Sequence, residues 1–88
     1  MWIIEFTNVA KKDKEVVKNS AYFNKVCELL SVIANNPFQN PPPYEKLQPY
    51  KDNVYSRRIN KQHRLVYEVT IETKYIRILS MWTHYERS

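Results

Sequence analysis

Two kinds of side chain in this sequence could exchange a proton near neutral pH. His63 and His84 are the two histidines, and histidine has the ordinary pKa closest to neutrality. Glu45 follows directly after a proline-rich stretch, which would hold its backbone stiffly at the edge of a sheet. A carboxylate, a histidine and nearby arginines are the groups needed to cleave RNA without a metal ion.

In such a reaction the carboxylate takes the proton from a ribose 2′-hydroxyl, and the freed oxygen attacks the adjacent phosphorus. Arginines stabilise the extra negative charge, and the histidine protonates the leaving 5′-oxygen. The acid and the base each contribute about 10²–10⁴-fold to the rate, and a positioned charge donor contributes about 10²–10³-fold. Spacing alone does not bring Glu45, Arg64 and His84 to one phosphate; it indicates only that three neighbouring strands could do so.

Each candidate also has an ordinary structural interpretation. A histidine near a chain end is usually exposed, a glutamate in a polar loop is usually solvated, and paired arginines often form a solvated strand face. Trp82 and Tyr85 could pack on the sheet instead of stacking on bases. Cys27 lies on the apolar stripe of a predicted helix, and we expect it to be an inert core residue.

The positive charge is concentrated in one segment. The 88 residues have a formal net charge of +5, yet residues 1–45 and 65–88 are each balanced. Such a local excess suggests a polyanionic partner, most simply nucleic acid, and the alternative is a pair of strands with solubilising basic tips. The excess lies in residues 46–64, where Asp52 is the one acid and the basic residues are Lys46, Lys51, Arg57, Arg58, Lys61 and Arg64.

Composition excludes several kinds of site. The absence of glycine rules out a P-loop and a G-x-G-x-x-G fingerprint. One cysteine and two histidines are too few for an internal disulfide or a closed zinc site, and we expect neither a metal nor a cofactor. No apolar run approaches about 20 residues and no signal peptide is visible, so we expect no membrane association and a cytoplasmic protein.

The hydrophobic pattern predicts one α+β domain over residues 1–88 that begins with a strand and two helices. Residues 2–6 are rich in β-forming side chains. Residues 9–19 predict a polar helix anchored by its three valines, and Thr7 or Asn8 offers an N-cap. A second helix ends before the first proline, and its apolar side chains are Phe23, Val26, Cys27, Leu30, Ile33 and Ala34.

The second half of the chain predicts a small sheet. Residues 37–53 hold all five prolines and form a stiff extended connection. Three strands follow at 54–59, 63–69 and 75–82, and residues 60–62 join the first two as a hairpin. The expected order is β-α-α-β-β-β, a mostly antiparallel twisted sheet with both helices packed on one face and the other face left for function.

The length of the hairpin turn decides which arginine faces Arg64. A three-residue turn at 60–62 places Arg58 directly opposite Arg64 on one side of the sheet. A two-residue turn would place Arg57 there instead, because a slip of one residue exchanges the faces.

The sequence resembles a known toxin family at several points. Residues 55–67, Y-S-R-R-I-N-K-Q-H-R-L-V-Y, resemble the signature W/Y-S-R-R-I-x-x-x-H-R-L-V-Y of Txe/YoeB toxins, which belong to the RelE/ParE superfamily of type II toxin–antitoxin systems. Residues 36–38 resemble its T/N-P-F element and residues 45–47 its E-x-L element, and His84-Tyr85 resembles the terminal H-Y. The likeness covers the whole chain and implies a RelE/YoeB-like fold.

The resemblance implies a ribosome-dependent ribonuclease that enters the A site and cuts the bound mRNA codon. Glu45 would then be the general base and His84 the general acid, and Arg64 would stabilise the phosphate. We expect five further residues to contact the RNA: Arg58, Tyr85, Lys51, Arg57 and Gln48. The resemblance favours Arg58 over Arg57 as the second phosphate-binding arginine and assigns Tyr85 to holding the codon. Gln48 stands where the family commonly has lysine, so we expect an altered rate or codon preference.

The same resemblance implies partners. It predicts a homodimer and a YefM-like antitoxin whose acidic, disordered C-terminal segment folds over the basic cleft. Operator DNA would be bound only through the toxin–antitoxin complex. Two alternatives are a ParE-like toxin that binds DNA gyrase without cutting RNA and a non-catalytic nucleic-acid-binding module. The carboxylate–histidine pair favours the nuclease, because a gyrase poison has no need of it.

Overall fold

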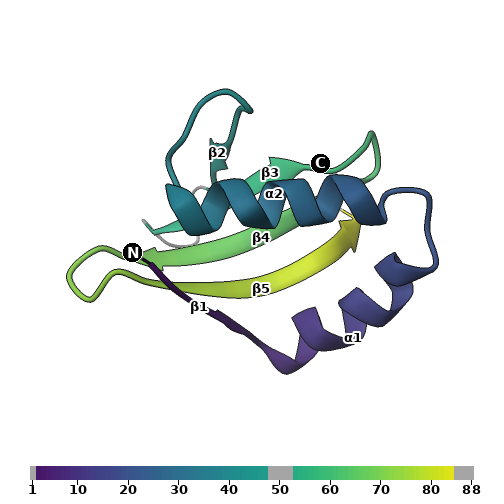
Figure 1. Ribbon diagram of the computed structural model, residues 1–88, viewed down its shortest axis with the longest axis horizontal. Helices are drawn as coiled ribbons and strands as arrows, with labels where there is room; N and C mark the ends of the chain where they lie inside the picture. Colours follow the sequence, from purple (N-terminus) through teal and green to yellow (C-terminus); the bar gives the residue numbers. More distant parts are fainter. Residues whose placement is uncertain (1, 48–52, 85–88) are drawn as a thin grey trace.

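One five-stranded sheet organises the computed structural model, which describes residues 2–47 and 53–84 (Figure 1). The strand order is β1-β5-β4-β3-β2; β1 runs parallel to β5, and the other neighbours are antiparallel. The predicted α+β class and mostly antiparallel sheet are therefore confirmed. The elements are β1 (Ile3–Phe6), α1 (Asn8–Lys18), α2 (Phe23–Asn35), β2 (Glu45–Lys46), β3 (Val54–Arg58), β4 (His63–Thr70) and β5 (Tyr75–His84).

Helix α1 begins as predicted but buries a different face. The Thr7 hydroxyl accepts a hydrogen bond from the Ala10 N–H (3.1 Å), which provides the expected N-cap. The buried residues are Ala10 and Val17, two helical turns apart. Val9 and Val16 were expected to be anchors, but they are more than half exposed. Each of these valines lies one residue before a buried position, and a helix with 3.6 residues per turn therefore places it away from the buried face.

Helix α2 buries a narrower stripe than its sequence suggests. Val26, Leu29 and Ile33 are buried, and Leu30 is partly buried. Cys27 is exposed, so its predicted place in the core is wrong. The helix rests on a single sheet, and residues on the flank of its stripe therefore face solvent. Among the described residues, neither helix is long and apolar enough to cross a membrane.

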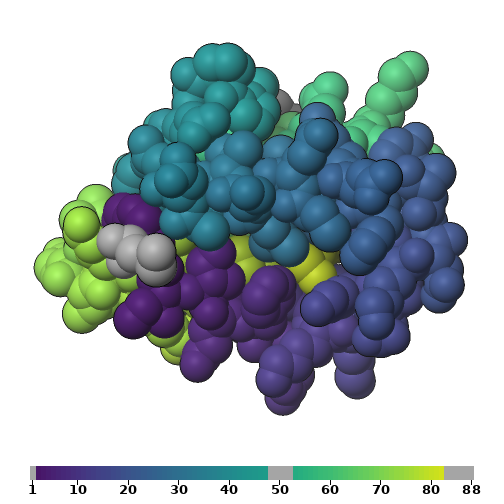
Figure 2. Space-filling view, viewed as in Figure 1, coloured from purple at the N-terminus to yellow at the C-terminus, as the bar shows by residue number. Residues whose placement is uncertain are grey.

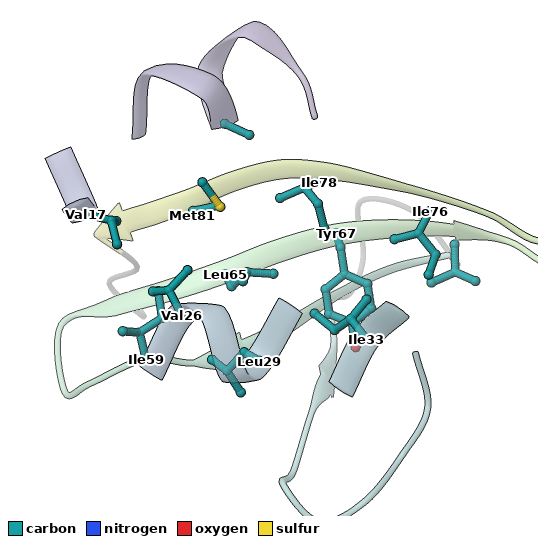
Figure 3. Packing of buried hydrophobic residues seen from close by; sticks show 12 residues of the cluster. Val17, Val26, Leu29, Ile33, Ile59, Leu65, Tyr67, Ile76, Ile78 and Met81 are labelled. Carbon is teal, nitrogen blue, oxygen red and sulfur yellow. The ribbon is translucent and has the colours of Figure 1, made fainter. Parts of the chain in front are cut away.

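The core lies between the helices and one face of the sheet. Figure 3 shows side chains of α2 facing Leu65 and Tyr67 of β4, with Val17 of α1 near Met81 of β5. Figure 2 shows both helices lying over this face, with a strip of β5 visible between them. Because side chains alternate along a strand, Arg64 and Val66 belong to the opposite face of β4. The prediction that both helices pack on one face is confirmed.

Two strands differ from the predicted pattern, and both matter for the site. Glu45 and Lys46 form the extra strand β2, which pairs with β3 at the sheet edge. Strand β5 extends two residues further than predicted and ends at His84. Its pairing with β4 shifts register next to Arg64, and the Met81 N–H in this irregular stretch donates to Asp13 of α1 (2.9 Å).

Candidate active site

An ion pair joins two of the three residues expected to be catalytic. Arg64 Nη1 lies 2.8 Å from Glu45 Oε1 and also donates to the Ser56 hydroxyl at 3.0 Å. The Arg64 side chain is 14% exposed, whereas that of Glu45 is 55% exposed. The guanidinium is therefore held from two sides, and the carboxylate beside it stays open to an approaching substrate.

Pairing between three strands brings these groups together. Glu45 of β2 lies opposite Ser56 of β3, and residues directly opposite each other project from the same face. Arg58 of β3 lies opposite Arg64 of β4, which is the register expected for a turn at 60–62. Sequence reasoning did not single out Ser56, which lies opposite Glu45 of β2 and Val66 of β4 and accepts a hydrogen bond from Arg64.

A pocket of about 200 Å³ forms around the ion pair. One carboxylate and two guanidinium groups meet there, so the pocket carries a net positive charge that suits a phosphate. Its lining residues are Pro43, Tyr44, Glu45, Arg58 and Arg64.

The end of β5 pairs with the start of β4, the strand that carries Arg64. His84, which is described by its backbone, pairs with His63, and Thr83 pairs with Arg64. The backbone thus carries the predicted acid to the strand next to Arg64. Tyr85 lies outside the described residues, as do two further expected RNA contacts, Gln48 and Lys51.

Arg57 was expected to contact RNA, but the structure places it in the interior. Its side chain is fully buried on the helix side of the sheet and donates four hydrogen bonds to neighbouring protein groups. Alternation along β3 explains the difference, because Arg58 is the residue that projects toward Arg64. Of the two adjacent arginines, Arg58 lines the pocket and Arg57 does not.

The second histidine, which lies opposite His84 in the sheet, packs against Trp82 of β5. His63 stacks on Trp82, with ring centroids 3.8 Å apart and planes 7° from parallel, and its ring approaches the side chain of Asn60. Tyr22 of the α1–α2 connection packs against the same tryptophan. Among the described residues, no three His, Cys, Asp or Glu side chains gather closely enough to hold a metal ion.

Comparison with known proteins gives the family. Residues 5–85 match the YoeB-like toxins of bacterial type II toxin–antitoxin systems. The chain belongs to this family. Toxin YoeB of Synechocystis is 35% identical to it over 77 residues, which cover 88% of this chain and 80% of that protein.

Solved structures from Staphylococcus aureus share both the sequence family and the fold. The YoeB dimer matches with a TM-score of 0.80 and 34% identity over 96% of this chain and 98% of that one. The heterotetrameric YoeB–YefM complex matches with a TM-score of 0.77 and 34% identity, covering 97% and 99% of the two chains. The YoeB-like fold predicted from the signature is confirmed.

The YoeB signature at residues 55–67 supplies both faces of β3 and β4. Arg58 and Arg64 line the pocket and Ser56 accepts a hydrogen bond from Arg64, whereas Arg57 and Tyr67 lie behind the sheet in the core. The motif therefore combines groups suited to phosphate chemistry with groups that support the fold.

Proposed function

We propose that this YoeB-family toxin is a metal-independent endoribonuclease that cleaves mRNA in the ribosomal A site and so inhibits translation. The observation that carries the proposal is the Glu45 carboxylate 2.8 Å from the Arg64 guanidinium, in a pocket that also contains Arg58. A base next to two cations is the arrangement that in-line attack on a phosphodiester requires.

Glu45 takes the proton from the ribose 2′-hydroxyl, and that oxygen attacks the adjacent phosphorus. Arg58 and Arg64 stabilise the negative charge of the pentacoordinate phosphate. The bond to the 5′-oxygen then breaks, and His84 gives that oxygen a proton. The products are a 2′,3′-cyclic phosphate and a 5′-hydroxyl end, so the reaction consumes neither water nor a cofactor in this step.

Arg64 serves two groups in this mechanism. A guanidinium has five N–H donors, so it can orient Glu45 and still contact a phosphate oxygen. Ser56 accepts one of these hydrogen bonds and limits the rotation of the arginine. Keeping base and charge donor in one hydrogen-bonded unit reduces the reorganisation needed at the moment of reaction.

Three further residues hold the codon: Tyr85 stacks on a base, and Gln48 and Lys51 contact the RNA. The YoeB–YefM complexes of Staphylococcus aureus support a YefM-like antitoxin as partner, and the YoeB dimer supports a homodimer. An acidic antitoxin segment complements the net charge of +5. Operator DNA is bound through that complex, and the toxin acts on ribosomes in the cytoplasm.

Expression of single-residue variants in bacteria tests the proposal. Glu45→Gln and His84→Gln should each relieve growth arrest and leave mRNA intact, because each loses a proton-transfer group that contributes about 10²–10⁴-fold. Glu72→Gln is the matched control, since Glu72 is exposed in the turn between β4 and β5. Growth arrest that persists in Glu45→Gln cells with intact mRNA would contradict the nuclease and point to a target such as gyrase.

A further inference from the structure

The guanidinium of Arg57 is buried among neutral acceptors. Nη1 donates to the Pro42 carbonyl (2.6 Å), and Nη2 donates to the carbonyls of Pro37 (3.0 Å) and Gln39 (2.9 Å). Nε donates to the hydroxyl of Tyr67 (3.1 Å). Four of the five N–H groups are thus used, three of them on the backbone of one segment, residues 37–44.

This segment has few other ways to satisfy its backbone. Residues 37–44 contain four prolines, which lack an N–H and cannot join a sheet ladder. Buried carbonyl groups still need hydrogen-bond donors, and the planar guanidinium of Arg57 supplies three of them. Tyr67 adds a second link, because its hydroxyl donates to the Pro37 carbonyl (2.8 Å).

Aromatic packing extends the contact to the residue before Glu45. The Arg57 guanidinium lies over the Tyr44 ring, 5.1 Å from its centroid. That ring also packs against Phe38 and Tyr55, at centroid distances of 6.0 and 5.8 Å. Tyr44 is therefore fixed on several sides, and its backbone leads directly into β2.

Strand β2 depends on this support because it is only two residues long. Glu45 pairs with Ser56, and Lys46 pairs with Tyr55. Two pairs at a sheet edge hold a strand weakly, so the approach of the preceding segment must set where the carboxylate lies.

We propose that Arg57 is a positioning residue for the cleavage reaction. It crosslinks residues 37–44 from behind the sheet and so holds Glu45 against Arg64 on the other face, without touching RNA itself. This inference rests on the proposed function, because it assigns Arg57 to the same base.

Single-turnover cleavage on programmed ribosomes, with toxin in excess, separates this role from binding. Arg57→Met should lower the cleavage rate about 10²-fold, the cost expected when a reacting group is displaced by about 1 Å. The affinity for ribosomes should change less than about threefold, because Arg57 lies away from the RNA face. Tyr67→Phe should lower the rate by a smaller factor, since it removes one hydroxyl and leaves the backbone contacts of Arg57.

Leu29→Ala is the matched control for lost stability. Leu29 is buried in α2 and is not one of the groups that accept a hydrogen bond from Arg57, so this variant should melt at a lower temperature yet cleave at the wild-type rate per folded molecule. Rates are compared on the folded fraction measured by circular dichroism. If Arg57→Met does not fold, Tyr67→Phe decides the matter, and a Tyr67→Phe rate equal to that of Leu29→Ala would overturn the inference.

A double variant distinguishes this inference from the proposed function. When Glu45→Gln has removed the base, adding Arg57→Met should slow the residual cleavage less than twofold, because no base is left to position. A full 10²-fold further loss would overturn the positioning role. If Glu45→Gln alone leaves cleavage unchanged, the proposed function is wrong, and that conclusion does not depend on the result for Arg57→Met.

Discussion

Three arginines within eight residues of sequence have different surroundings in this protein. Arg64 is partly buried and paired with Glu45, Arg58 lines the pocket beside it, and Arg57 is enclosed by carbonyl groups behind the sheet. Their charge is the same, so their different roles follow from the face of the strand and from the acceptors that each one meets.

At the scale of single residues, replacing Arg58 tests whether the pocket contributes to cleavage. Arg58→Ala should slow cleavage about 10²–10³-fold, because it removes a cation placed to stabilise the developing charge. Single-turnover rates measure this effect, and Lys12→Ala, which removes an exposed cation of α1 outside the basic segment, is the control. Cleavage by Arg58→Ala at the normal rate would remove Arg58 from the reaction.

Tyr67 gives a pH-dependent test of the buried cluster. Burial raises the pKa of Tyr67 to about 12, whereas an exposed tyrosine has a pKa near 10. The unfolded chain therefore loses this proton first, so the contribution of Tyr67 to the free energy of unfolding should be constant below pH 10 and fall by about 2–3 kcal/mol as the pH rises from 10 to 12. Urea unfolding at several pH values checks this, and Tyr67→Phe should lose that part of the decline. Equal slopes in both proteins would contradict it.

The sequence could predict part of this arrangement. Alternation and the length of the turn place Arg58 opposite Arg64, as the structure confirms. They do not predict the burial of Arg57, because its backbone acceptors lie 15 to 20 residues earlier in a proline segment whose path has no simple pattern. A buried arginine can be recognised only when those carbonyl groups are placed.

At the scale of elements, every helix and strand that the structure describes is predictable from the sequence except β2. Both helices and the three long strands follow their hydrophobic patterns, with ends that differ by one or two residues. Strand β2 was missed, because two residues after a run of prolines carry no periodicity. That short strand carries Glu45, so the least predictable element holds the proposed base.

Because Leu29 of α2 is buried and Cys27 is exposed, substitutions at these two positions should change the free energy of unfolding by different amounts. Leu29→Ala should lower the free energy of unfolding by about 2–5 kcal/mol, because it leaves a cavity at a site that is 2% exposed. Cys27→Ser should change it by less than about 0.5 kcal/mol, since Cys27 is exposed. Urea titrations of both variants measure the difference, and a large loss in Cys27→Ser would place that residue back in the core.

At the scale of the whole molecule, the two faces of the sheet differ: one is covered by helices and the other carries the pocket. The helices cover one face of the sheet (Figure 1). The pocket is lined by Glu45, Arg58 and Arg64, which project from the other face and belong to or adjoin the basic segment 46–64. A molecule built in this way can present cations to RNA without exposing its core.

The salt dependence of RNA binding tests whether the basic segment 46–64 contacts RNA. If about four phosphates are neutralised, the slope of log affinity against log salt is about −3 for single-stranded RNA. Binding to ribosomes or RNA should then weaken about 50-fold between 50 and 200 mM salt. Filter binding over this range measures the slope, and an affinity independent of salt would exclude the basic segment from the interface.

The most direct test of the central claim is to map the cut ends of a defined mRNA incubated with the purified protein. The mRNA is presented free and on ribosomes with a known codon in the A site, and Glu45→Gln serves as the comparison. We expect one cut within the A-site codon, ending in a 2′,3′-cyclic phosphate and a 5′-hydroxyl, only on ribosomes and only with an intact Glu45. An uncut A-site codon, or equal cutting by Glu45→Gln, would contradict the account.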